Sequence, residues 1–200
     1  MTTWANNTIN KATDSVAGTS ANTDATSPQT ASNDDSIGTV AWSNPDNIKA
    51  SDDSKAFFST FGTISNYLKA TNFGFSIPTG STIVGIKAEI EQSEEGPGNA
   101  TENSIKIVKG GTISGDDQST SATIPASDTY TTYGGTTDLW GETWTAEDIN
   151  LSTFGVVFSA TGTSNSIYVD HIRITVYYTT AGTSATWTNE SKGLTTWTND

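Results

Sequence analysis

The stretch IVGIKAEIE at residues 83–91 alternates apolar and polar side chains along most of its length. Successive side chains of a β-strand point to opposite faces, so the even-numbered residues from Val84 to Ile90 are expected to share one face. The charged side chains of Lys87 and Glu89 then lie on the other face. This pattern predicts a strand that is buried on one side and solvated on the other.

Similar patterns recur on both sides of this stretch. Residues 168–178 form the longest one, with Ile172, Ile174 and Val176 expected on one face and His171 and Arg173 on the other. Further strands are expected at residues 72–77, 104–108 and 154–158, with weaker ones at 39–42, 56–61 and 122–125. About eight short strands joined by turns predict an all-β fold, an antiparallel jelly-roll-like β-sandwich.

The residues expected in the core follow from the same alternation. They are Phe73, Phe75, Val84, Ile86, Ile90, Ile105, Ile107, Val156, Phe158, Ile172, Ile174 and Val176. The one helical signal is short: Thr145 supplies a capping hydroxyl, and Glu147 and Asp148 follow in the first turn. We expect a helix of one or two turns there, crossing an end of the sandwich.

The two ends of the chain differ from the middle in composition. Residues 1–37 are rich in Thr, Ser, Asn, Ala and Asp, and residues 179–200 are rich in Thr, Ser and Gly. Both segments carry few large apolar side chains, so neither is expected to fold alone. The expected organisation is an N-terminal arm at 1–37, a sandwich at 38–178 and a C-terminal arm at 179–200. The C-terminal arm repeats Trp-Thr-Asn at residues 187–189 and 197–199.

The arms nevertheless contain Trp4, Trp187 and Trp197. Tryptophan is enriched among the residues that dominate protein interfaces. We therefore interpret these three side chains as interface anchors that dock the arms on another chain. The alternative is that the arms are disordered and their tryptophans make no contact.

Charge and composition exclude several classes of function. The formal net charge is -13, which disfavours binding to nucleic acid and to anionic membranes. The chain has no Cys and one His, which excludes thiolate metal sites and His-rich metal sites. No long apolar run predicts a membrane span, and residues 1–37 lack the apolar region of a signal peptide.

Candidate catalytic and metal-binding groups are weak. His171 is adjacent to Asp170, but neighbouring side chains on a strand leave from opposite faces, so the two are not expected to form a catalytic dyad. Asp46, Asp52 and Asp53 carry oxygen ligands of the kind that Ca²⁺ prefers, yet their spacing matches no EF-hand, and we interpret them as solvated loop acids. We expect no enzyme activity, no cofactor and no bound metal.

Tyr133, Trp140 and Trp144 form an aromatic group around a Gly turn, with Tyr130 just before it. Such a group can plug the end of a sandwich, which is the interpretation that we favour. The alternative is a glycan-binding platform, because exposed aromatic rings stack on sugar rings.

Several stretches carry a family resemblance. They are SNYLKATNFGFSIP at 65–78, IVGI at 83–86, TDLWG at 137–141, FGV at 154–156 and YVDHIRITVYY at 168–178. This part of the chain resembles a jelly-roll-like β domain of bacteriophage virion proteins, and the ending WTNESK at 187–192 is similar to short repeats beside phage tail and fibre proteins.

The resemblance implies a non-enzymatic virion structural protein, in a capsid decoration, tail or fibre, that is made in the host cytoplasm. Its expected partners are other virion proteins and further copies of itself. The alternative is a carbohydrate-binding module of a host-attachment apparatus, with host surface glycans as ligands. A hydrolase acting on surface polysaccharide is a third, weaker hypothesis.

Overall fold

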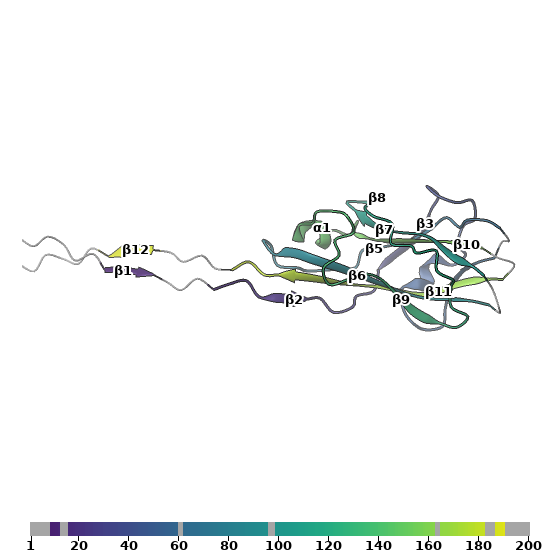
Figure 1. Cartoon of the computed structure of the whole chain (residues 1–200), viewed down its shortest axis with the longest axis horizontal. Coiled ribbons are helices and arrows are strands. Elements are labelled where there is room, and N and C mark those ends of the chain that lie inside the picture. The colour runs from purple at the N-terminus through teal and green to yellow at the C-terminus, as the bar shows by residue number, and fades with distance from the viewer. Residues whose placement is uncertain are drawn as a thin grey trace, which may run out of the picture.

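The computed structural model describes residues 9–12, 16–59, 62–95, 99–162, 165–182 and 187–190, and in the first and last of these it describes the backbone. It confirms the predicted all-β antiparallel sandwich, in which two sheets face each other (Figure 1). No helix in the described part of the chain is long and apolar enough to cross a membrane.

Sheet 1 consists, in spatial order, of β3 (Thr30–Asp34), β5 (Tyr67–Thr71), β10 (Gly155–Thr161), β7 (Thr101–Lys109) and β8 (Thr112–Ser114). Every neighbouring pair in this sheet is antiparallel. The central strand β10 is buried over nearly its whole length. That burial explains why Phe154 to Phe158 form a nearly continuous apolar run, since both faces of the strand are covered.

Sheet 2 consists, in spatial order, of β2 (Ser20–Asn22), β11 (Ile167–Thr179), β6 (Thr82–Glu94) and β9 (Thr129–Gly134), and β4 (Ala56–Phe58) pairs with the start of β11. The long strands β6 and β11 pair along their whole length. They contain the two stretches with the clearest alternation in the sequence, and the structure confirms both strands. A short 3-10 turn, η1 (Pro45–Ile48), precedes β4.

The core between the sheets contains nearly all the residues expected there. Phe73, Phe75, Ile86, Ile90, Ile105, Ile107, Val156, Phe158, Ile172, Ile174 and Val176 are buried. Val84 is the exception, because it is half-buried. The pairing of β6 with β11 skips Val84, since Tyr177 lies opposite Gly85 and Tyr178 lies opposite Ile83. This β-bulge reverses the alternation, and Ile83 takes the buried place instead.

Residues 72–77 alternate in burial as predicted but do not form a strand. Asn72 and Gly74 have positive φ values of 59° and 72°, which interrupt an extended ladder. The backbone of Ile77 bonds instead to the side-chain amide of Asn150, whose Oδ1 accepts from the Ile77 N–H at 2.8 Å and whose Nδ2 donates to its carbonyl at 2.9 Å. Residues 39–42 and 122–125 likewise make isolated bridges and no strand.

The N-terminal boundary of the sandwich differs from the prediction. Residues 20–34 were assigned to an arm, yet they supply β2 and β3, one edge strand to each sheet. An edge strand has one neighbour, and its hydrogen bonds come from the backbone, so a polar sequence is sufficient. Ala31 supplies the small apolar contact that packs β3 against the core.

The predicted short helix is α1 (Ala146–Asn150), and it begins with a capping box. Thr145 Oγ1 accepts from the Asp148 N–H at 3.1 Å, and the Asp148 carboxylate accepts from the Thr145 N–H at 3.0 Å. Both bonds satisfy donors that the first turn would otherwise leave unpaired. Ile149 is buried, so the helix packs its apolar side onto the sandwich.

Candidate functional site

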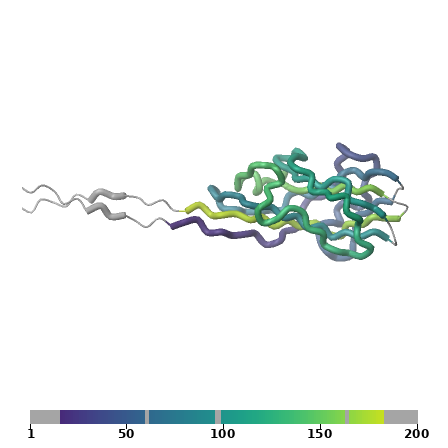
Figure 2. Tube along the Cα trace, in the orientation of Figure 1, coloured from purple at the N-terminus to yellow at the C-terminus, as the bar shows by residue number. Residues whose placement is uncertain are grey.

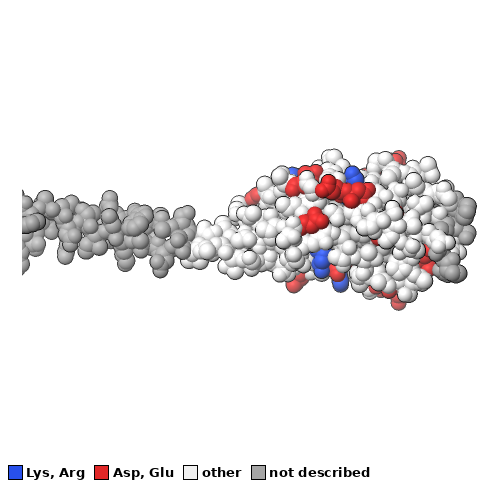
Figure 3. Space-filling model, in the orientation of Figure 1, with Lys and Arg blue, Asp and Glu red and all other residues white. Residues whose placement is uncertain are grey.

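The two ends of the sandwich chain run side by side. The Thr180 N–H donates to the Thr19 carbonyl at 2.9 Å, and the Thr19 N–H donates to Thr180 Oγ1 at 3.0 Å. Figure 2 shows both segments leaving the same end of the body. Figure 3 shows that the narrow end formed by these segments carries no charged side chain on the visible face. The chain therefore enters and leaves the sandwich at one place.

Beyond this place the chain pairs with itself again. β1 (Ile9–Ala12) and β12 (Trp187–Glu190) form a two-stranded antiparallel ribbon, in which Ala12 lies opposite Trp187 (Figure 1). We call this pair of strands the terminal ribbon. Of the three predicted anchors, Trp187 is the first residue of β12, and Trp4 and Trp197 lie outside the described residues.

The predicted glycan-binding residues do not form an exposed platform. Trp140 is fully buried and Tyr133 is 4% exposed, so neither ring offers a face to a sugar. The indole N–H of Trp140 donates to the Ile86 carbonyl at 2.9 Å, which ties the loop before α1 to sheet 2. The structure corrects the alternative hypothesis for these two residues: they belong to the core.

Trp144 is half-buried and also serves the fold. Its indole N–H donates to the Leu139 carbonyl at 3.0 Å, and its ring meets Phe154 edge-on at 5.4 Å between centroids. Lys109 Nζ lies 5.2 Å from the centroid of the Trp144 ring, a cation–π distance. These contacts hold Trp144 against the body.

A buried polar cluster joins the two sheets beneath Tyr133. The Tyr133 hydroxyl, on β9, donates to Glu102 Oε1, on β7, at 2.7 Å. Gln92 Nε2, on β6, donates to the same hydroxyl at 2.9 Å, and the Thr120 N–H donates to Glu102 Oε2 at 3.1 Å. Burial and the adjacent Glu102 carboxylate raise the pKa of Tyr133, so the phenol stays protonated. The sequence analysis did not predict this cluster. Gln92 and Glu102 are polar residues, and the alternation of apolar and polar side chains does not indicate that they are buried.

His171 is the centre of a second polar group, on the outer face of sheet 2. Its Nε2 lies 2.8 Å from Ser27 Oγ, and its Nδ1 lies 2.8 Å from the Tyr130 hydroxyl. The carboxylate of Asp170 accepts instead from the Asp53 N–H at 3.3 Å, and Asp170 stands at a bulge of β11. His171 thus contacts a serine and a tyrosine, which the sequence did not indicate.

The surroundings of His171 favour its neutral form. The imidazole is 7% exposed, and this burial, with the nearby Arg173 cation, lowers the pKa of His171 despite the opposing charge of Glu91. Burial and Glu91 raise the pKa of Tyr130. A neutral imidazole has one donor and one acceptor, which matches one hydroxyl on each side. The arrangement fastens the segment that carries Ser27 to the sheet.

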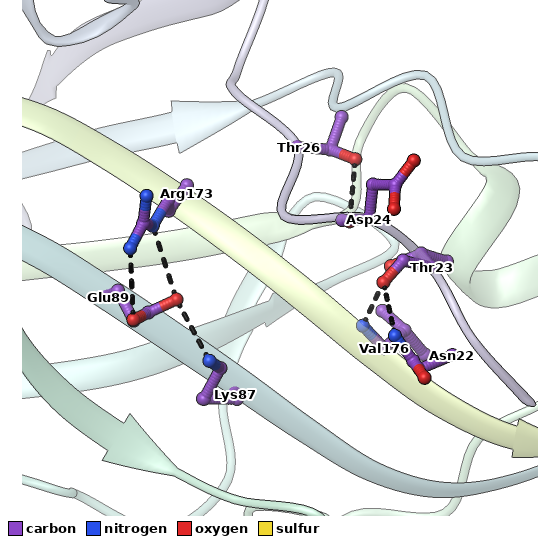
Figure 4. Close-up of polar contacts among 8 residues, drawn as sticks. All are labelled: Asn22, Thr23, Asp24, Thr26, Lys87, Glu89, Arg173 and Val176. Atoms are coloured by element: carbon purple, nitrogen blue, oxygen red, sulfur yellow. Dashed lines mark hydrogen bonds and ion pairs between the residues drawn. The ribbon is translucent and has the colours of Figure 1, made fainter. Parts of the chain in front are cut away.

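Arg173, Glu89 and Lys87 form a charged group beside His171 on the same outer face (Figure 4). Arg173 donates to both carboxylate oxygens of Glu89 at 3.2 Å, and its guanidinium carbon lies 4.0 Å from the centroid of the Tyr130 ring. Burial opposes the ionised form of Glu89, but the hydrogen bonds from Arg173 and Lys87 outweigh it and lower its pKa. The group locks β11, β6 and β9 together from outside.

Figure 4 also shows how the edge segment joins β11. The Val176 N–H donates to Thr23 Oγ1 at 3.0 Å, and the Thr23 N–H donates to the Val176 carbonyl at 2.9 Å. The Thr26 hydroxyl donates a hydrogen bond to the Asp24 carbonyl at 3.0 Å. A threonine side chain therefore replaces one backbone partner, which keeps this short, polar strand on the sheet.

The acidic loop residues Asp46, Asp52 and Asp53 are exposed. Asp46 pairs with Lys49 at 2.5 Å, and Asp52 Oδ1 accepts from the Ser54 N–H at 3.0 Å. Within the described ranges, no group of three or more His, Asp or Glu side chains is arranged to hold a metal ion.

The pH dependence of stability tests the assignment of His171. The unfolded chain binds a proton at the ordinary pKa of 6.5, whereas buried His171 binds it at lower pH. Folding therefore gains stability from this group above pH 6.5, and the gain is lost as the pH falls towards the lowered pKa. We expect urea unfolding to show a steeper loss of stability as the pH falls below 6.5 in the native chain than in His171→Gln.

Two features of the chain make this comparison clean. His171 is the single histidine, so the substitution removes the only imidazole. Burial raises the pKa of Asp170, which acts with the opposite sign, but this group is present in both proteins and cancels. Equal pH slopes in the two proteins would show that the buried imidazole is not held neutral.

No family model, curated protein or solved structure matches this chain.

Proposed function

We propose that the chain is a non-enzymatic structural protein of a virion and that its paired ends attach it to the assembly. The observation that carries the proposal is the common exit of both ends and their pairing in the terminal ribbon. A body attached through one narrow end projects away from whatever holds it. This is the geometry of a decorating or protruding subunit.

The terminal ribbon is suited to contact with another chain. A two-stranded ribbon is marginally stable in water by itself. Each of its strands has one partner among the described residues, which leaves its other edge able to add to a neighbouring sheet. Main-chain hydrogen bonds at such an edge do not need a particular side-chain sequence, so the Thr- and Asn-rich ends can supply them.

The polar clusters of the body support a structural role. The groups around Tyr133 and around His171, in which the pKa values of both residues are shifted, have their hydrogen bonds directed at other protein groups. Each connects separate strands, which is a structural task. The virion as the site of assembly comes from the sequence likeness of the body to jelly-roll-like phage domains, and we propose the localisation on that basis.

Removal of the terminal ribbon tests the proposal. We expect a chain shortened to residues 16–182 to keep its β-sheet circular dichroism and cooperative unfolding, because all strands of both sheets lie within this range. We also expect the full chain to form larger assemblies than the shortened chain does, as measured by sedimentation velocity and negative-stain electron microscopy.

A point variant distinguishes the loss of β1–β12 pairing from the deletion of the terminal segments. Asn10→Pro removes a backbone donor within β1, where Asn10 lies opposite Asn189, whereas Asn10→Ser keeps it. The proline variant should behave like the shortened chain and the serine variant like the native one. Unchanged assembly of the shortened chain would contradict the proposal.

A further inference from the structure

The outer edge of sheet 2 at β9 is open. Among the strands that the structure describes, β9 is the last of the sheet and pairs with β6 alone. In an antiparallel pair, alternate residues bond to the neighbour, and the backbone groups of the others point to the free side. No backbone hydrogen bond reaches β9 on that side from any described residue.

β9 also lacks the features that protect the other sheet edges. Natural edge strands are kept from pairing by short length, charged residues, proline or bulges. At the other three edges, β2 and β8 are three residues long, and β3 ends at Asp34, which pairs with Lys69. β9 has six residues, TYTTYG, with no charge and no proline.

Contacts on both faces hold β9 in place. On the inner face, Tyr133 bonds to Glu102, and Gln92 Nε2 donates to Thr131 Oγ1 at 3.0 Å. On the outer face, the Tyr130 ring lies under the Arg173 guanidinium. The strand is thus ordered in an extended form before any partner arrives, which lowers the conformational entropy lost on pairing.

We propose that β9 pairs antiparallel with β9 of a second copy of this chain. Such a pairing is self-complementary and closes with two-fold symmetry. Residues opposite one another share a face, and Thr132 lies on the outer face beside Glu89, so Thr132 can stand opposite Thr132 of the copy. Each body carries a strong negative charge, but the strand itself brings no like charges together.

This inference does not rest on the proposed function, because the terminal ribbon takes no part in it. The pairing would join two sheets into one continuous sheet, with the terminal ribbons free for other contacts. It identifies one surface and one partner: the uncharged edge of β9 and the same edge of another molecule.

A charge placed on the edge tests the pairing in the full chain. The Thr132 side chain is exposed, and a lysine there stands beside Glu89, so Thr132→Lys should not harm the fold. The matched control is Thr112→Lys, an exposed threonine on the edge strand β8. Sedimentation velocity should show that Thr132→Lys halves the mass of the species that the native chain forms, whereas the control should keep the native mass.

A cross-link locates the contact. Because the chain has no cysteine, Thr132→Cys introduces a single thiol, and a short bis-maleimide should join two chains through it, whereas Thr112→Cys should not cross-link. A monomeric native chain, a dimer that survives Thr132→Lys, or equal cross-linking of the two cysteine variants would each overturn the inference. A dimer abolished by Asn10→Pro and retained by Thr132→Lys would instead assign the contact to the terminal ribbon.

Discussion

Trp140→Ala is expected to lower the free energy of unfolding by about 3–5 kcal/mol, the range for removing a large buried aromatic side chain. The indole is fully buried, and its removal leaves a cavity. It also takes one of two hydrogen-bond donors from the Ile86 carbonyl, which keeps the Gly135 N–H at 3.0 Å. Urea denaturation at neutral pH measures the change. The backbone of Trp140 has φ of 58°, so the loop is already in a conformation that most residues avoid.

Trp144→Ala is the matched control, because Trp144 is the same residue type a few positions away. Its ring is half-buried, so truncation should cost clearly less than at Trp140. Equal losses of stability in the two variants would show that Trp140 does not anchor the loop. The sugar-stacking role rejected above for its ring would then have to be considered again.

Glu102→Ala is the second substitution with a large expected effect. It leaves the Tyr133 hydroxyl and the Thr120 N–H without their acceptor between the sheets. An unsatisfied buried polar group costs about 1–3 kcal/mol, so a loss on the order of 2–5 kcal/mol is expected. Glu102→Gln keeps an acceptor oxygen and should lose much less.

A double-mutant cycle with Tyr133→Phe measures the link between the sheets. Glu102→Ala alone leaves the Tyr133 hydroxyl without its acceptor, and Tyr133→Phe removes that hydroxyl. The double variant should therefore be more stable than the sum of the two single losses implies. Urea unfolding of the four proteins gives the coupling energy. Additive losses would show that the Tyr133 and Glu102 side chains do not depend on each other.

Alternation was sufficient to predict the long strands and the core. β6 and β11 each have one buried face, so the two-residue period is visible in their sequences. It failed at Val84, where the bulge adds a residue that no local pattern announces. It also failed for the edge strands β2, β3, β8 and β9, since an edge strand can be polar and still form. It missed β5 as well, which is an interior strand of sheet 1.

The polar groups were beyond sequence reasoning for a different reason. Ser27 and His171 are 144 residues apart in the chain, and their contact exists because β2 and β11 are neighbours in sheet 2. Tyr133 was recognised as part of an aromatic group, but its role follows from Glu102 on the opposite sheet. Contacts of this kind depend on strand order, which alternation does not specify.

The common exit of the two ends also determines how the body responds to force. When the ends are pulled apart from each other, the pairing of the terminal ribbon breaks first, then the bonds between Thr19 and Thr180, and then those along β2. The bonds break one after another, and each carries the load alone. When both ends are pulled together, the load passes into β11, an interior strand bonded on both sides, and is shared by many bonds in shear. The protein should therefore unfold at low force when its two ends are pulled in opposite directions. It should resist a higher force when both ends are held at one point and the body is pulled away from them.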